Sequence, residues 1–374
     1  MLFINRVIKK TTGMKKNNFK IVLLVLLFFG LNKNLISQDK DNYLIDSVNY
    51  YAMLDGYCAM TALQMNLDYY GFKIDQSLLL NLGWNYGFMY LKTPFYTIAY
   101  PDTDPVEEIV FACNHIGFKA TVLIHKTLKE SRETIVKYIS QDIPVLIQWT
   151  PHTILAYGYK DSANVVIYND PGDFRNQSVD NIDKIPFGKG ENISMPISDW
   201  EKMPYLWGMR QYQIVVIEPK DKTININWKV IWKRNAEKTL GSIKNQFQAF
   251  FGIDGMNEII KDLNEISGKN ISKCIEIIKN YEMCFKLGIG FRRDAAAFLA
   301  GQASIMIDNN LRFASIEFMK SAQYFHKGYN LIDWFNNNYE QKSGEQAISE
   351  FIEIFEKIVE CEIEGSAYLL KALK

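Results

Sequence analysis

Metal-binding and disulfide-forming residues are scarce in this sequence of 374 residues. It contains only four histidines and five cysteines, with no CxxC or HExxH pattern among them. Protein zinc sites use such closely spaced ligands, so we expect no bound metal, and no sequence pattern indicates another cofactor. The cysteine count is odd and the chain is large, which argues against a disulfide framework.

An excess of charge of either sign is also absent. The 42 lysines and arginines balance the 42 aspartates and glutamates. Without surplus positive charge the chain lacks the electrostatic footprint of a nucleic-acid-binding protein, so we expect no nucleic-acid partner. The hydrophobic share of 48% and the charged share of 22% are ordinary for a globular protein, and the length suffices for two domains.

The apolar run at residues 21–31 follows several lysines and has only 11 residues. That length is too short to span a bilayer and is typical of a signal-peptide core. We therefore predict that residues 1–38 are a signal peptide or an N-terminal signal anchor. The protein is then exported to the periplasm or the extracellular space, and touches a membrane only through an uncleaved segment. The alternative is a buried helix in a cytoplasmic protein.

Residues 39–218 alternate between helix and strand signals. Asp55, Asp75 and Asp104 each precede an apolar helical pattern, so we expect them to cap three helices. Cys113 lies on the apolar stripe of the third helix, which indicates a core position. Strands are expected at 119–124, 145–149, 152–159, 164–170 and 212–217. The pattern predicts an α+β domain.

Residues 219–232 are predicted to be a linker, and residues 233–374 an all-helical domain. The second half of the chain shows helical periodicity almost throughout, without a visible repeat. Helices are expected at 257–266, 271–285, 294–307, 313–334 and from 347 to the end. The predicted order is thus an α+β domain followed by an all-α domain.

Cys58 lies where a turn enters the first of these helices. The positive end of the helix dipole favours a thiolate there, and the thiolate is the reactive form of cysteine. Unpaired N–H groups in the first turn can also stabilise a developing oxyanion. Cys58 is therefore a candidate nucleophile, and the alternative is a small core residue.

His152 opens one strand of a predicted hairpin, and Asp170 closes the other. A turn centred near Asp161 places His152 opposite Asp170 on the same face, close enough for an imidazole–carboxylate hydrogen bond. A slip of one residue would bring Asn169 there instead. The order Cys, His, Asp along the chain is typical of spatially assembled thiol sites. Cys58, His152 and Asp170 are therefore the candidate catalytic residues, with Asp170 favoured over Asn169.

Several segments, taken in order, resemble the butirosin biosynthesis protein H family. The segments are YCAMTAL at 57–63, HTILAYGY at 152–159, YNDP at 168–171, GIDGM at 252–256 and GFRR at 290–293. The resemblance implies a papain-like cysteine peptidase fold, with N-terminal helices packed on an antiparallel sheet. It also implies that the second half is the helical domain of unknown function that usually follows.

The same resemblance implies a Cys-His-Asp acyltransferase that forms an amide through an acyl-enzyme. Cys58 would carry the acyl group, His152 would act as base and then as acid, and Asp170 would orient the imidazole. The partners implied are an acyl or peptidyl donor, an acyl carrier protein if the enzyme is cytoplasmic, and an amine acceptor. Alternatives are a leader-peptidase-type cysteine hydrolase and an inactive papain-like binding module. Nothing in the sequence indicates the oligomeric state.

The sequence departs from this family at the residue before the nucleophile. Tyr57 stands where the acyltransferases usually have histidine. No glutamine that could serve as an oxyanion donor immediately precedes Cys58, and we interpret Gln148 as an exposed amide rather than such a donor. Arg292 and Arg293 could meet an acidic carrier or a phosphate, but adjacent charges on a helix more often form a solvated edge.

Overall fold

The structure is a computed structural model of the whole chain. It describes residues 41–53, 57–92, 97–100, 104–149, 152–172, 190–202, 212–220, 224, 226–241, 249–337 and 341–372. The predicted signal segment and the predicted cap Asp55 lie outside these residues. The chain from residue 42 onward forms one compact unit. In the described part, no helix is both long and apolar enough to cross a membrane.

The first half is built on a seven-stranded antiparallel sheet. Its strand order is β4-β9-β5-β6-β7-β8, and β1 pairs with β6 near its end. This arrangement confirms the predicted antiparallel sheet. The strands are β1 (Tyr43–Leu44), β4 (Phe118–Ile124), β5 (Val145–Trp149), β6 (His152–Lys160), β7 (Val165–Asn169), β8 (Ile193–Pro196) and β9 (Gln213–Pro219).

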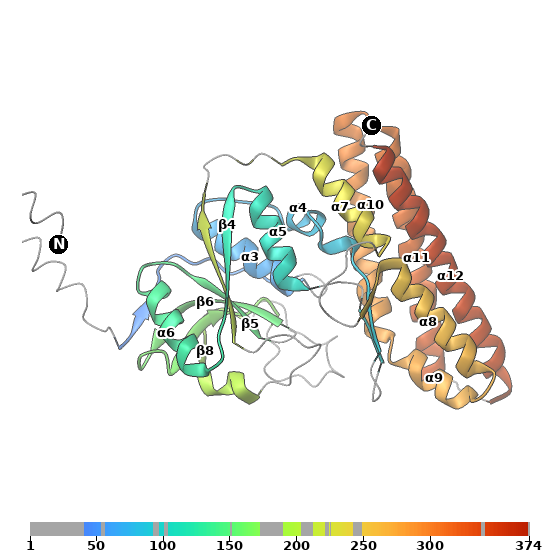
Figure 1. The fold of residues 1–374 in the computed structure, drawn as a ribbon, viewed down its shortest axis with the longest axis horizontal. Helices are drawn as coiled ribbons and strands as arrows, with labels where there is room; N and C mark the ends of the chain where they lie inside the picture. The colour runs from blue at the N-terminus through green and yellow to red at the C-terminus, as the bar shows by residue number, and fades with distance from the viewer. Residues whose placement is uncertain are drawn as a thin grey trace, which may run out of the picture. The chain divides into compact units, whose positions relative to one another are not determined.

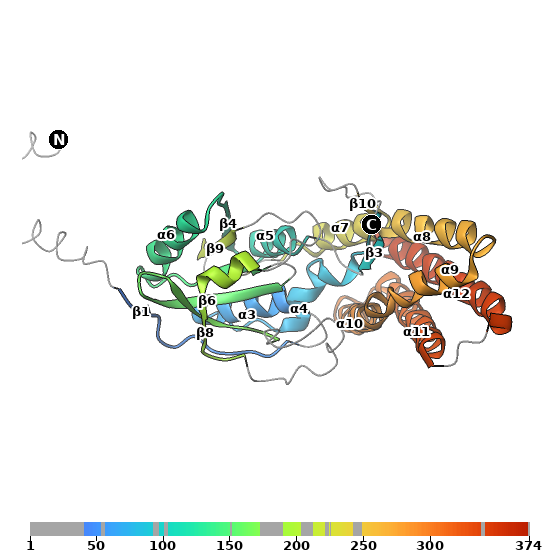
Figure 2. The same cartoon turned by 90° about the horizontal axis from the view of Figure 1, so that it is seen from below.

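Helices cover both faces of this sheet (Figure 2). Alternation along β5 divides the two faces, because successive side chains of a strand point to opposite sides. Leu146 packs into the core with α3 (Cys58–Tyr69) and α5 (Pro105–His115). Val145 and Ile147 pack into the core with α6 (Leu128–Ile139). The candidate nucleophile therefore begins a helix that rests on the sheet carrying His152.

Local capping chemistry explains where the helices begin. Asp75 accepts a hydrogen bond from the N–H of Ser77 at 2.6 Å and caps α4 (Gln76–Asn81). Asp104 accepts from the N–H of Val106 at 2.9 Å and caps α5, whose first residue is proline. Both predicted caps are confirmed, and the predicted core position of Cys113 is confirmed by its complete burial.

A second, three-stranded sheet was not predicted. Its order is β10-β2-β3, formed by β2 (Met89–Lys92), β3 (Thr97–Tyr100) and β10 (Ala249–Phe251). Ala249 pairs with Leu91, and Phe251 pairs with Met89. A strand from the second half of the chain thus completes a hairpin of the first half. Apart from this three-residue strand, the described part of the chain from 233 onward is helical, which confirms the predicted all-α second half.

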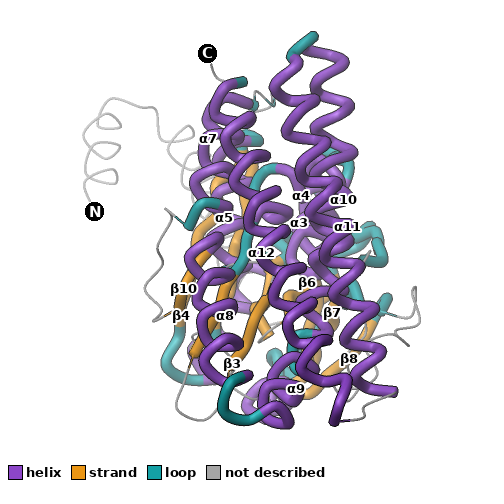
Figure 3. Tube along the Cα trace, turned by 90° about the vertical axis from the view of Figure 1, so that its right-hand side faces the viewer, coloured by secondary structure: helices purple, strands orange, loops and turns teal. Residues whose placement is uncertain are grey.

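Six helices lie in the described part of the second half. They are α7 (Trp228–Thr239), α8 (Gly252–Ser267), α9 (Ile271–Lys279), α10 (Glu282–Met306), α11 (Asn309–Asn337) and α12 (Gln341–Lys371). The long helices α10, α11 and α12 run side by side (Figures 1 and 3). A break in the helix was predicted between residues 285 and 294, but α10 continues through this range. The chain turns earlier instead, at Asn280 and Tyr281. The exact domain boundaries stay a prediction.

One hydrophobic core joins α3 to the long helices. The cluster contains Met60 and Leu63 of α3 together with Phe291 of α10, Phe318 of α11 and Leu369 of α12. All five side chains are almost completely buried. The helix that carries Cys58 is therefore packed by residues from both halves of the chain.

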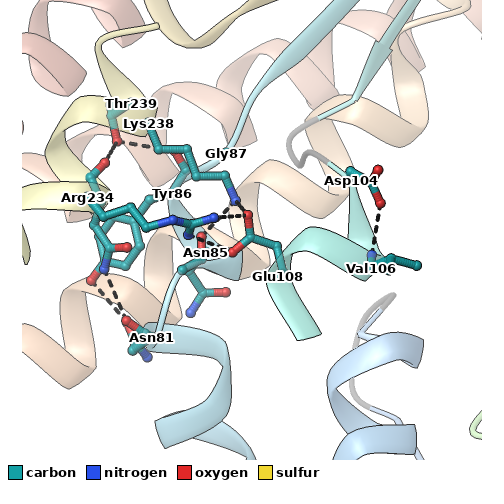
Figure 4. Close-up of polar contacts among 12 residues, drawn as sticks. Asn81, Asn85, Tyr86, Gly87, Asp104, Val106, Glu108, Arg234, Lys238 and Thr239 are labelled. Carbon is teal, nitrogen blue, oxygen red and sulfur yellow. Dashed lines mark hydrogen bonds and ion pairs between the residues drawn. The ribbon is translucent and has the colours of Figure 1, made fainter. Parts of the chain in front are cut away.

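A buried ionic cluster reinforces the same junction (Figure 4). Glu108 of α5 accepts hydrogen bonds from Arg234 at 2.8 and 2.9 Å and from Lys238 at 2.8 Å. Lys238 also donates to the carbonyl of Gly83 at 2.9 Å. Burial alone would raise the pKa of Glu108, but the nearby Lys238 and Arg234 charges lower it to about 2. The carboxylate therefore stays charged and links α5 to α7.

Candidate active site

Cys58 is the first residue of α3 and is 8% exposed. With Asp55 as the predicted cap, Cys58 was expected near the third residue of this helix, so the helix begins later than expected. The N-cap is Tyr57, whose side chain makes no capping hydrogen bond. The N–H groups of the first helical turn have no partner further back in the helix. The thiol thus lies beside donors that favour an anion.

His152 and Asp170 lie in contact. The His152 Nε2 atom is 2.6 Å from the Asp170 Oδ1 atom, and both side chains are buried. The same Oδ1 atom accepts the N–H of Gly172 at 2.9 Å, and the N–H of Asp170 donates to the Gly190 carbonyl at 2.8 Å. The Asp170 carboxylate is therefore held by a backbone N–H as well as by the imidazole, and the backbone of Asp170 is held by Gly190.

The strand register that was expected to produce this contact is wrong. In β6 and β7, Leu155 pairs with Asn169 and Ala156 pairs with Tyr168, followed by a shift between Ala156 and Gly158. Asp170 is consequently a diagonal neighbour of His152, two positions from the predicted pairing. A displacement of two residues keeps a side chain on the same face, so the two side chains still meet.

The environment of His152 favours the imidazolium form. Burial alone would lower the pKa of His152, but the Asp170 carboxylate and the Cys58 sulfur raise it to about 10 through charge and hydrogen bonding. The Nε2 atom of this imidazole faces Asp170, and the Cys58 sulfur acts on the same ring.

Asn169 belongs to a different set of contacts. Its Oδ1 accepts the N–H of Asn192 at 3.1 Å, and its Nδ2 donates to the carbonyl of Asn49 at 3.5 Å. The residue braces the end of β7 against two other segments. The imidazole of His152 makes its 2.6 Å contact with Asp170, the neighbouring residue.

Gln148 is buried rather than exposed, which overturns the sequence interpretation. Its side chain is 2% exposed, and its Oε1 accepts the Thr153 hydroxyl at 2.7 Å. The hydrogen bond directs the carbonyl end of the amide toward Thr153. The amide nitrogen of Gln148 is a donor. It lies on β5, the strand in which the next residue, Trp149, pairs with His152.

Arg292 and Arg293 do not form a solvated edge together. Arg292 is fully buried and its Nε is 2.7 Å from Glu362 Oε1 of α12. Its guanidinium also donates to the carbonyls of Asn85 and Gly87. Arg293, by contrast, is exposed. Sequence reasoning missed this role of Arg292. The signal in the sequence was that Arg292 falls on the apolar stripe of its helix, where an arginine is rare unless it is paired.

Tyr57 is the second residue whose role the sequence left open. It is almost completely buried, its hydroxyl donates to Asp294 Oδ2 at 2.7 Å, and its ring stacks on Phe291 at 4.8 Å. Both partners lie on α10. The residue adjoining the candidate nucleophile is thus held by the helical half.

Residues 45–204 match the family model described as Peptidase_C39 like family. The matched segment contains Cys58, His152 and Asp170. This match supports a papain-like cysteine peptidase-like domain, within the broad class of papain-like cysteine hydrolases and transferases. No curated protein matches the chain.

Proposed function

We propose that the protein is a thiol acyltransferase of the butirosin biosynthesis protein H type, working through a Cys58 acyl-enzyme. The observation that carries the proposal is the His152–Asp170 hydrogen bond of 2.6 Å. Cys58 supports it as one of the groups that raise the pKa of His152. A nucleophile, a base and a group that orients the base are the three parts that such catalysis needs.

In the first half-reaction the Cys58 thiolate attacks the carbonyl carbon of the acyl donor. A carbon–sulfur bond forms, the bond to the leaving group breaks, and the His152 imidazolium gives its proton to that group. The first-turn N–H groups of α3 stabilise the negative oxygen of the tetrahedral intermediate, and the amide donor of Gln148 is a further candidate for this task.

In the second half-reaction an amine attacks the thioester carbon. The neutral His152 imidazole accepts the proton of the amine nitrogen, the carbon–sulfur bond breaks, and the thiolate returns. The product is an amide. Asp170 keeps the imidazole oriented and stabilises its charged form throughout, without itself taking the proton.

The peptidase-family match favours hydrolysis as a second candidate function. In that case water replaces the amine and the product is an acid. Intact-mass analysis with thioester or peptide donors separates the two, because the acyl-enzyme resolves to an amide only when an added amine is the acceptor. An acyl-enzyme that water discharges at the same rate with and without amines contradicts transfer.

The test of the shared chemistry is the alkylation rate of Cys58 by iodoacetamide. We expect the rate near pH 7 to exceed that of a free thiol, and His152→Ala to remove the excess. If Cys58 reacts like a free thiol and His152→Ala changes nothing, the protein is an inactive papain-like binding module instead.

We also propose export, on the strength of the basic, apolar pattern in residues 9–31. An exported enzyme would draw its acyl group from a peptide, an ester or an exported thioester rather than from an acyl carrier protein. Cell fractionation decides this point, since an uncleaved chain in the cytosol contradicts export.

A further inference from the structure

The residue before the candidate nucleophile is anchored outside its own domain. Tyr57 is 1% exposed, and its hydroxyl donates to Asp294 Oδ2 over a distance of 2.7 Å. Its ring lies 4.8 Å from the ring of Phe291, with an angle of 24° between the two planes. A hydrogen bond to a carboxylate and a stacked ring together fix both the position and the orientation of a tyrosine.

The backbone of Tyr57 is at the same time part of the start of α3. Its carbonyl accepts the N–H of Thr61 at 3.0 Å and the Thr61 hydroxyl at 2.9 Å. The peptide bond that follows leads directly into Cys58. Any shift of Tyr57 therefore moves the first turn of α3, including the Cys58 side chain and its neighbouring N–H donors.

The helix that holds Tyr57 is itself fixed. Between Phe291 and Asp294 lies Arg292, which pairs with Glu362 of α12 and donates to the carbonyls of Asn85 and Gly87. These contacts attach α10 to α12 and to the segment that follows α4. Phe291 and Asp294 are thus presented to Tyr57 from a braced element.

We propose that Tyr57 and Asp294 are positioning residues for the Cys58 thiol. Through them α10 sets where the sulfur lies relative to His152, so the helical half takes part in building the site. The inference rests on the proposed function of Cys58. It assigns a role to the tyrosine that stands at the family's usual histidine position.

Tyr57→Phe tests the proposal with the smallest change. The variant keeps the ring on Phe291 and removes only the hydroxyl. We expect the iodoacetamide rate at Cys58 near pH 7 to fall by about tenfold, the factor that one hydrogen bond to a charged group corresponds to. We also expect the pH profile of that rate to change shape, which a loss of stability alone would not produce.

Asp294→Ala is the partner variant, and the pair forms a double-mutant cycle. If both residues act through their shared hydrogen bond, the double variant is no slower than the slower single variant. Should Asp294→Ala fold poorly, Tyr57→Phe still decides the outcome. Peptide mapping by mass spectrometry assigns the alkylation to Cys58 rather than to another cysteine.

Tyr70→Phe is the matched control at the other end of α3. The Tyr70 hydroxyl donates to the Ile217 carbonyl at 3.0 Å, so this variant also removes one partly buried hydrogen bond, made by the residue that caps the C-terminus of α3. We expect its melting temperature to fall and its Cys58 profile to match the wild type. An equal loss of Cys58 reactivity in Tyr70→Phe would overturn the proposal.

The remaining outcomes are distinguishable. If wild-type Cys58 reacts fast, depends on His152, and keeps its rate and profile in both Tyr57→Phe and Asp294→Ala, the positioning role is refuted while the acyl-transfer proposal stands. If wild-type Cys58 reacts no faster than a free thiol, both proposals fail together.

Discussion

Asp170 contacts His152 from a diagonal position across two strands. Its Oδ1 atom lies 2.6 Å from Nε2 of His152. The two residues are not opposite each other, because the strand pairing in which Asn169 faces Leu155 displaces Asp170 by two positions from His152. The contact depends on which face the two side chains share rather than on direct opposition. The electrostatic consequences of this pair can be measured in several ways.

Asp170→Asn should separate charge from shape at this position. The amide is nearly the same size, but it no longer supports the imidazolium, so the raised pKa of His152 should fall back toward its ordinary value. We expect the iodoacetamide rate at Cys58 near neutral pH to drop at least about tenfold, since each pKa unit corresponds to that factor in stabilisation of the charged form. The control is Asp262→Asn, the same change at a buried carboxylate of α8 that contacts Tyr90 and Lys92, and it should leave the profile intact.

The stability of the protein should decrease as the pH rises from about 6.5 to about 10. Burial lowers the pKa of His152, but Asp170 and Cys58 raise it more, to about 10 in the folded protein, against 6.5 for an ordinary histidine. In this window the folded state holds a proton that the unfolded state has lost, so rising pH favours unfolding. Urea unfolding at several pH values measures the slope, and His152→Gln should flatten it. A slope that is the same in the variant would contradict the assignment.

Glu108→Gln should be strongly destabilising, by about 3–5 kcal/mol, because it leaves the buried Lys238 and Arg234 without their shared carboxylate. The pKa of Glu108 is lowered to about 2 by these two cations against the opposing effect of burial. Its contribution is therefore present above pH 4.5 and lost as the pH falls toward 2. Acid unfolding curves should show this loss of stability below pH 4.5 in the wild type and not in Glu108→Gln.

The adjacent Glu107→Gln is the control for that experiment, since Glu107 is exposed. We expect a change within about 0.5 kcal/mol, as for most surface substitutions. A comparable destabilisation in both variants would mean that the Glu108 cluster contributes no special stability.

Gly190→Ala should disturb the support of Asp170. A Cβ atom at Gly190 would lie 1.7 Å from the Asp170 carbonyl oxygen, so one of the two segments must move. We expect slower alkylation of Cys58 together with lower stability. Gly301→Ala in α10 meets nothing within 4 Å and should instead raise stability by about 0.5–1 kcal/mol. Melting curves and alkylation rates of the two variants make the comparison.

Local chemistry was enough to predict much of the α+β part. Strand β5 has the predicted bounds, and the caps Asp75 and Asp104 act as expected, because each depends on residues a few positions apart. The predicted hairpin register was wrong for two reasons. The turn holds several residues with positive φ, among them Asp161 and Ala163, and a bulge between Ala156 and Gly158 interrupts β6 before that turn. Neither feature leaves a clear trace in the residue pattern.

Contacts between distant segments account for the other misses. Tyr57 and Asp294 are 237 residues apart, and Arg292 meets Glu362 across 70 residues. Strand β10 has only three residues, and its pairing with β2 is decided by packing rather than by its own sequence. A single sequence does not reveal which distant partner a buried polar side chain will find. The catalytic roles of Cys58, His152 and Asp170 themselves stay predictions that the alkylation experiments address.

The hydrophobic core that joins α3 to the long helices makes the packing of α3 depend on a distant part of the chain. Met60 and Leu369 lie in the same buried cluster. A substitution that opens a cavity in this cluster from the α12 side would therefore loosen the helix that begins with Cys58 without touching any residue of the candidate site.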